Sequence, residues 1–168
     1  NILITYDGSV AVVDMDSVQI IDGKTFYSGS VATAEYVPME YYNRPELNAP
    51  NARLTDNWDN FAMAVVFYQI LFGLHPFAVT PRNRGNDGAI EIYENIHNCL
   101  FPFGSNAKKV DRYPDVHNEF KNLSKPVQDL FIRAFAANDK RPTAQEWGIE
   151  ILNLINQVSR DNVPPQPD

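Results

Sequence analysis

An almost uninterrupted apolar segment at residues 58–72 constrains the fold of this chain more than any other feature. Its apolar side chains would cover most of the circumference of an α-helix, and Gly73 follows as a typical C-terminal stop. The segment contains Asp59, Asn60 and Gln69 and is shorter than the about 20 apolar residues that cross a bilayer. The pattern therefore predicts a buried helix at the centre of one domain.

Further helices are predicted on the C-terminal side of this segment. Residues 89–99 form an amphipathic pattern, and residues 124–135 carry a stripe with helical spacing that begins at Ser124 and Pro126. Thr143 and Glu146 have the spacing of a capping box, in which each side chain satisfies a free backbone amide of the other residue. That box opens a helix with the stripe Trp147, Ile151, Leu154, Ile155 and Val158. The intervening residues 100–122 contain several prolines and are predicted to hold little regular structure.

The N-terminal part has a different character. Residues 2–6 and 10–13 are β-rich and are separated by Asp7-Gly8-Ser9, which predicts a hairpin. Residues 18–21 are a candidate for a further strand, and residues 22–53 show no sustained period. The expected fold class is mainly α with a short β-hairpin.

Composition narrows the function classes. The 168 residues suit a single domain, and the net charge of -7 argues against nucleic acid or an anionic membrane as the main partner. Cys99 is the only cysteine, so no internal disulfide forms. Because the first residue is Asn1 and not Met, we expect the chain to begin within a longer protein. The proline-rich residues 161–168 are predicted to be a linker or tail.

Four short motifs follow one another along the chain. They are Asn1-Ile2-Leu3 with Val13-Asp14-Met15-Asp16; Thr33-Ala34-Glu35-Tyr36-Val37-Pro38-Met39-Glu40; Asp59-Asn60-Phe61-Ala62 with Gly73 and Pro76-Phe77; and Asn138-Asp139-Lys140-Arg141-Pro142-Thr143. In this order they resemble the helical C-terminal lobe of protein kinases, and most of all divergent bacterial Ser/Thr kinase-like proteins. The resemblance covers nearly the whole chain and implies an α+β kinase fold for the full-length protein.

The resemblance implies a metal and nucleotide site. Asn1 and Asp14 match the Asn and Asp with which kinases hold Mg²⁺ against the phosphates of ATP, and Asp16 is a candidate auxiliary ligand. Oxygen ligands of this kind suit the hard Mg²⁺ ion. Residues 15–46 would form the activation and substrate-binding segment. His97 and Cys99 lack the partners that a zinc site requires.

The resemblance also implies structural residues. Arg141 would pair with the Glu of the activation-segment signature, which is Glu40, with Glu46 as the alternative. Asp59 would anchor the catalytic-loop backbone in the family role. Its position near the start of a helix also makes it a candidate N-terminal cap or dipole partner.

Several kinase parts have no counterpart here. We find no Gly-rich loop and no ATP-pairing Lys, and the catalytic base would lie before Asn1. Phosphoryl transfer depends on positioning and charge stabilisation, so the chain alone is expected to hold no catalytic residue and to be inactive. Its expected partner is the N-lobe of the same protein, in the cytoplasm, without nucleic acid or membrane.

One departure keeps a second function open. Asp14-Met15-Asp16 replaces the Asp-Phe-Gly of kinases, and Asp16 lacks the backbone freedom of glycine. A pseudokinase that acts as a binding or scaffold module is therefore the alternative. In either case residues 1–160 would form the lobe, divided into a hairpin and activation-type segment at 1–55 and a helical core at 56–160.

Overall fold

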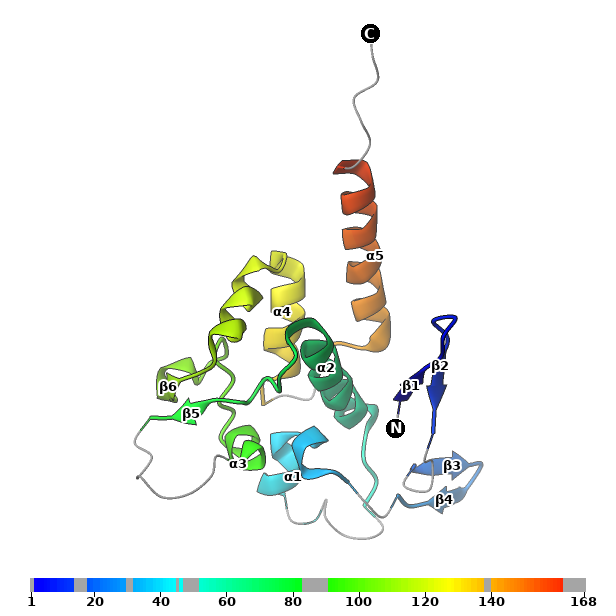
Figure 1. Cartoon of the computed structure of the whole chain (residues 1–168). Helices are drawn as coiled ribbons and strands as arrows, with labels where there is room; N and C mark the ends of the chain where they lie inside the picture. Colours follow the sequence, from blue (N-terminus) through cyan, green and yellow to red (C-terminus); the bar gives the residue numbers. More distant parts are fainter. Residues whose placement is uncertain are drawn as a thin grey trace.

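The computed structural model describes residues 2–13, 18–29, 32–44, 46, 52–82, 91–137 and 140–161. These residues form five α-helices, three two-stranded antiparallel sheets and short 3₁₀ segments, and the strands of the first two sheets precede all the α-helices (Figure 1). The expected class, mainly α with short hairpins, is confirmed. Among the described residues, no helix is long and apolar enough to cross a membrane.

Helix α2, Asp56–Phe72, forms the centre of the domain. Phe61, Ala64, Val65 and Tyr68 are fully buried on one side of it. Gly73 ends the helix in the left-handed conformation at φ 71°, and its amide donates to the carbonyl of Gln69, as predicted. The predicted burial of the apolar side chains was wrong for the last turn of α2. Ile70 and Leu71 face solvent there, since no described residue covers them.

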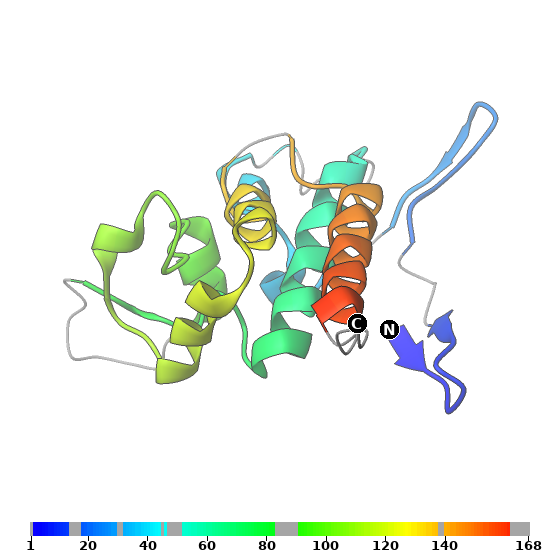
Figure 2. The ribbon, with the colours of Figure 1, turned by 90° about the horizontal axis from the view of Figure 1, so that it is seen from above.

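Helices α4, Lys125–Ala134, and α5, Ala144–Asp161, pack near α2 (Figure 2). The capping box is confirmed, since the Thr143 amide donates to Glu146 at 2.9 Å and the Glu146 amide donates to Thr143 Oγ1 at 3.3 Å. Of the predicted stripe on α5, Trp147 is buried and Leu154 packs against the core. Ile151, Ile155 and Val158 lie exposed, so that part of the prediction was wrong.

The N-terminal residues form two separate hairpins. The first, β1 (Ile2–Ile4) with β2 (Val10–Val12), is the predicted one. The second joins β3, Ile20–Asp22, to β4, Thr25–Tyr27. The candidate strand at 18–21 thus begins two residues later and ends one residue later than predicted. Its partner strand was not predicted. Both hairpins lie beside the helical body and not within it (Figures 1 and 2).

The region between α2 and α4 contains more regular structure than predicted. Helix α3 covers Ile92–His97, a part of the expected helix. Strand β6, Val110–Arg112, pairs with β5, Thr80–Pro81, across the intervening sequence. A 3₁₀ segment, η5, runs from Asp115 to Asn122. The sequence has no helical period at residues 115–122. His117 and Phe120 are both buried, so tertiary contacts of these side chains stabilise η5 instead.

Aromatic rings fill the core of the helical body. The ring of Tyr68 lies 5.4 Å from that of Phe131 and 5.8 Å from that of Phe101, centre to centre. Trp147 of α5 packs edge-on against Phe131 at 4.7 Å. Because these rings come from α2, α4, α5 and the loop after α3, one continuous core ties the helices together.

Candidate functional site

The predicted ligands Asn1, Asp14 and Asp16 lie outside the described residues. The strands that carry them toward the site are described. Ile2, directly after Asn1, pairs with Val12, which is two residues before Asp14. The chain segments next to the two predicted ligands therefore run side by side in one hairpin.

The loop of this hairpin is ordered by its own polar groups. The Thr5 hydroxyl donates to Asp7, and the Ser9 amide donates to the same carboxylate oxygen at 3.1 Å. These bonds, that from Thr5 first, lower the pKa of Asp7 below its ordinary value. Gly8 has φ 83°, a conformation that favours glycine. The local sequence thus builds a rigid turn at the far end of the hairpin from the predicted ligands.

The predicted activation segment contains two short helical elements, η2 (Ala34–Tyr36) and α1 (Met39–Asn43). Neither was predicted, since the sequence shows no helical period there. Tyr42 donates its hydroxyl to the Ala34 carbonyl at 2.6 Å and so braces one element against the other. Burial, with the neighbouring Tyr41 hydroxyl adding to it, raises the pKa of Tyr42 to about 12, so this donor keeps its proton at neutral pH.

Arg141 fastens α1 to the helical core. Its Nη2 donates to both carboxylate oxygens of Glu40 at 2.9 Å, and its Nε donates to the Ala134 carbonyl at 2.9 Å. The Arg141 side chain is fully buried, whereas Glu40 keeps 18% of its side-chain surface exposed. Glu40, and not Glu46, is therefore the partner of Arg141 in this structure.

The surroundings of Arg141 act on its charge in opposite directions. Burial lowers its pKa below the ordinary value of 12.5, and the Glu40 carboxylate opposes that shift. An arginine remains protonated under such conditions, so the pair is a buried ion pair at neutral pH. The ring of Phe61 lies 5.4 Å from the guanidinium carbon and adds a cation–π contact.

Asp59 lies in the first turn of α2, where a negative charge interacts favourably with the helix dipole. Its side chain is exposed, yet enough protein surrounds the carboxylate that desolvation raises its pKa, with the Asp56 carboxylate adding to the effect. Within the described residues no hydrogen bond to the Asp59 carboxylate is formed. The N-cap of α2 is Thr55, so Asp59 does not occupy the capping position.

Two buried histidines join distant parts of the chain, and of these His117 was not identified from the sequence. The Nε2–H of His75 donates to the Glu35 carbonyl at 2.9 Å, and its Nδ1 accepts from the Phe77 amide at 3.2 Å. This bond ties η2 to the loop after α2. Both ring nitrogens are thereby satisfied in the neutral form, and burial lowers the pKa of His75 to about 4.

His117 is satisfied in the same way. The Ala78 carbonyl, 3.3 Å from Nε2, can only accept, so Nε2 carries the proton and Nδ1 accepts from the Tyr68 hydroxyl at 2.7 Å. Burial lowers the pKa of His117. Asn95 is a second missed residue, with its amide donating to the carbonyls of Phe77 and Val79. Only the His75-Pro76-Phe77 run gave any sequence signal for this cluster.

His97 is the last residue of α3, and Cys99 lies in the loop that follows. Nε2 of His97 contacts the Asn43 side-chain oxygen at 3.0 Å, and burial raises the pKa of the Cys99 thiol. Among the described residues, no group of three or more His, Cys, Asp or Glu side chains is placed to hold a metal ion.

Comparison with known proteins gives a distant relationship. No protein-family model matches the chain. It is 26% identical over 159 residues to protein kinase YegI of Escherichia coli strain K12, which is 92% of this chain and 24% of that protein. It is 28% identical over 156 residues to protein kinase YegI of Escherichia coli O157:H7, covering 90% of this chain and 23% of that protein. The chain thus spans about a quarter of the length of these relatives. These matches suggest a kinase-like relationship.

Proposed function

We propose that this chain is the helical C-lobe of a bacterial Ser/Thr protein kinase-like protein. With an N-lobe supplied by the same polypeptide, the full-length protein would transfer a phosphoryl group from Mg-ATP to protein in the cytoplasm, where ATP is available. The chain alone would be inactive, because it carries neither the catalytic base nor the residues that grip ATP. Residues 1–160 would form the lobe and residues 161–168 the linker.

The observation that carries this proposal is the Glu40–Arg141 ion pair. The kinase resemblance nominated these two residues, which lie 101 positions apart in the sequence. Their contact at 2.9 Å joins the end of the proposed activation segment to the helical core. A chance resemblance of short motifs gives no reason for two of them to meet in this way.

Two further features support a missing N-lobe and catalytic loop. The hairpin of β1 and β2 exposes Ile2, Ile4, Val10 and Val12 on one face, which is costly for an isolated surface in water. Asp59 has a raised pKa and no hydrogen-bond donor within the described residues, as expected if its partners, the catalytic-loop amides, come from the segment before Asn1.

In this proposal Asn1 and Asp14 would hold Mg²⁺, with Asp16 as a possible third ligand. An amide oxygen and carboxylates are the donors that Mg²⁺ accepts, and the pairing of Ile2 with Val12 supports their approach. The metal, when bound, would neutralise charge on the phosphates of ATP. The role of this chain's own residues would be to position: Glu40 and Arg141 would hold the substrate-binding segment against the core.

The test is nucleotide binding and autophosphorylation by the full-length protein. We expect Mg-dependent ATP binding that is lost in Asp14→Ala and kept in Asp22→Ala, a matched change on β3. The 168-residue chain alone is expected to show neither activity. A full-length protein that binds no nucleotide, with or without Mg²⁺, would contradict the proposal.

The alternative function is a pseudokinase that serves as a binding or scaffold module. The sequence Asp14-Met15-Asp16 in place of Asp-Phe-Gly favours it. The pseudokinase would be favoured over the enzyme if the full-length protein bound nucleotide but phosphorylated no protein, and if Asp16→Gly behaved in the same way.

A further inference from the structure

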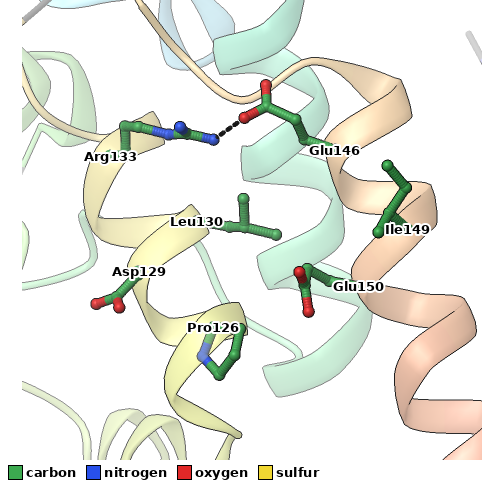
Figure 3. Close-up of a pocket in the computed structure, with 7 residues that line it drawn as sticks. All are labelled: Pro126, Asp129, Leu130, Arg133, Glu146, Ile149 and Glu150. Atoms are coloured by element: carbon green, nitrogen blue, oxygen red, sulfur yellow. Dashed lines mark hydrogen bonds and ion pairs between the residues drawn. The ribbon is translucent and has the colours of Figure 1, made fainter.

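A groove of about 320 Å³ lies between helices α4 and α5 (Figure 3). Leu130 points from α4 toward α5 and forms part of its floor, and Pro126 and Ile149 extend the apolar lining. The volume is large enough for one large apolar side chain of a partner. Pockets of this size are used for such anchors in helix-in-groove recognition.

On the α5 side, Ile149 lines the groove between Glu146 and Glu150, and a further apolar side chain of α5 lies exposed beside it. Ile149 is 51% exposed and Leu152 is 60% exposed, three residues apart and so on neighbouring parts of one face. Exposed large aliphatic residues that gather beside a groove are a sign of an interaction surface. The groove and the face share Ile149.

The charges around the groove select the kind of partner. Arg133 and Glu146 form an ion pair at one end (Figure 3), and Asp129, which also lines the groove, pairs with Lys125. The Glu150 carboxylate projects between the helices, and no hydrogen bond or ion pair engages it within the described residues. A groove with an apolar floor and one carboxylate that has no partner among the described residues favours a partner that carries a Lys or Arg next to an apolar anchor.

We propose that the groove between α4 and α5 is a docking site for a basic amphipathic helix of a partner protein. A second copy of this chain fits less well, because a two-fold interface brings each patch against itself. Glu146 and Glu150 would then approach their own copies, in a chain whose net charge is already -7. This inference does not depend on kinase activity.

The experiment measures binding of a labelled helical peptide of leucine and lysine to the full-length protein, beside a twin with glutamate in place of lysine. We expect binding of the lysine peptide only. Glu150→Lys should weaken it about fivefold by reversing the paired charge, and Ile149→Ser about tenfold by removing the apolar contact. Glu94→Lys, the same charge change at an exposed site on α3, should leave the affinity within about twofold.

Four results would overturn the proposal. Equal binding of both peptides, or equal loss in Glu150→Lys and Glu94→Lys, would mean that the acidic chain attracts the peptide without a site. Self-association that Ile149→Ser abolishes would assign the groove to a second copy. Binding to this chain but not to the full-length protein would mean that another part of the same polypeptide fills the groove. All three variants should melt at the temperature of the unchanged protein, so loss of fold is tested directly.

Discussion

The helical body and the N-terminal hairpins contain similar apolar residues, but they bury them to very different degrees. Phe61 and Tyr68 of α2 are fully buried, whereas Ile4 of β1 is 70% exposed and Val10 of β2 is 66% exposed. The helices bury their apolar faces against one another. The hairpins find no such cover among the described residues. The helical body is therefore stabilised by its own apolar core. The exposed apolar side chains of the hairpins are instead typical of a surface that contacts another part of a protein.

The largest difference is expected between core and hairpin truncations. Phe61→Ala should lower the free energy of unfolding by about 3–5 kcal/mol, because it removes a ring that touches Phe77 and Phe135 and leaves a cavity. Ile4→Ala should change it by less than about 0.5 kcal/mol, since its side chain is already in water. Urea unfolding of both variants measures the contrast. Equal losses would mean that the hairpin is packed as firmly as the core.

The second contrast concerns buried and exposed charge. Arg141→Met should cost about 3 kcal/mol, at the lower end of the range for breaking a buried pair because Glu40 retains some contact with water. Arg82→Met, at an exposed position after β5, should cost less than about 0.5 kcal/mol.

The double variant Glu40→Met with Arg141→Met separates the two causes of that loss. It should recover part of the stability, because no uncompensated charge remains near the core. A double variant that is less stable than Arg141→Met by the full cost of a second substitution would show that Glu40 has no coupling to Arg141.

The third contrast is in response to pH. Burial holds the folded-state pKa of His75 at about 4, below the ordinary value of 6.5. The unfolded chain therefore takes up the proton first, so stability is complete above about pH 6.5 and is lost as the pH falls toward 4. Between pH 7 and pH 5 the loss from this histidine should be about 2 kcal/mol.

Unfolding measured at both pH values tests the assignment. His75→Gln should reduce the difference between pH 7 and pH 5, leaving the part that His117 contributes in the same direction. A pH dependence that survives in His75→Gln without any reduction would contradict the role of buried neutral His75.

Local signals explain how much of this fold could be predicted from the sequence. The helical periods of α2 and α4, the glycine stop at Gly73 and the capping box at Thr143 are all properties of neighbouring residues. The hairpin of β1 and β2 likewise follows from its Asp7-Gly8 turn. Each was predicted because the stabilising partner lies within a few positions in the chain.

Tertiary contacts explain the rest. The pairing of β5 with β6 and the Tyr68–His117 bond join positions far apart in sequence, and no local pattern marks them. Of the candidate site, the motif order nominated Glu40 with Arg141, while nothing in the sequence indicated Asn95 or the polar role of His117. The ligand assignments of Asn1, Asp14 and Asp16 stay predictions, since these residues lie outside the described part of the chain.

The smallest contrast compares two threonines that make similar local hydrogen bonds. Thr143 caps α5, whose first turn holds Trp147 in the core, whereas Thr5 braces the exposed hairpin loop through Asp7. Thr143→Ala should cost about 1 kcal/mol, the usual cost of a lost helix cap, and Thr5→Ala less than about 0.5 kcal/mol. Thr143→Ser, which keeps the capping hydroxyl, should stay close to the unchanged protein. If Thr5→Ala proves as costly as Thr143→Ala, the hairpin folds cooperatively with the helical body. Its exposed aliphatic face would then be stable in water without a partner that covers it.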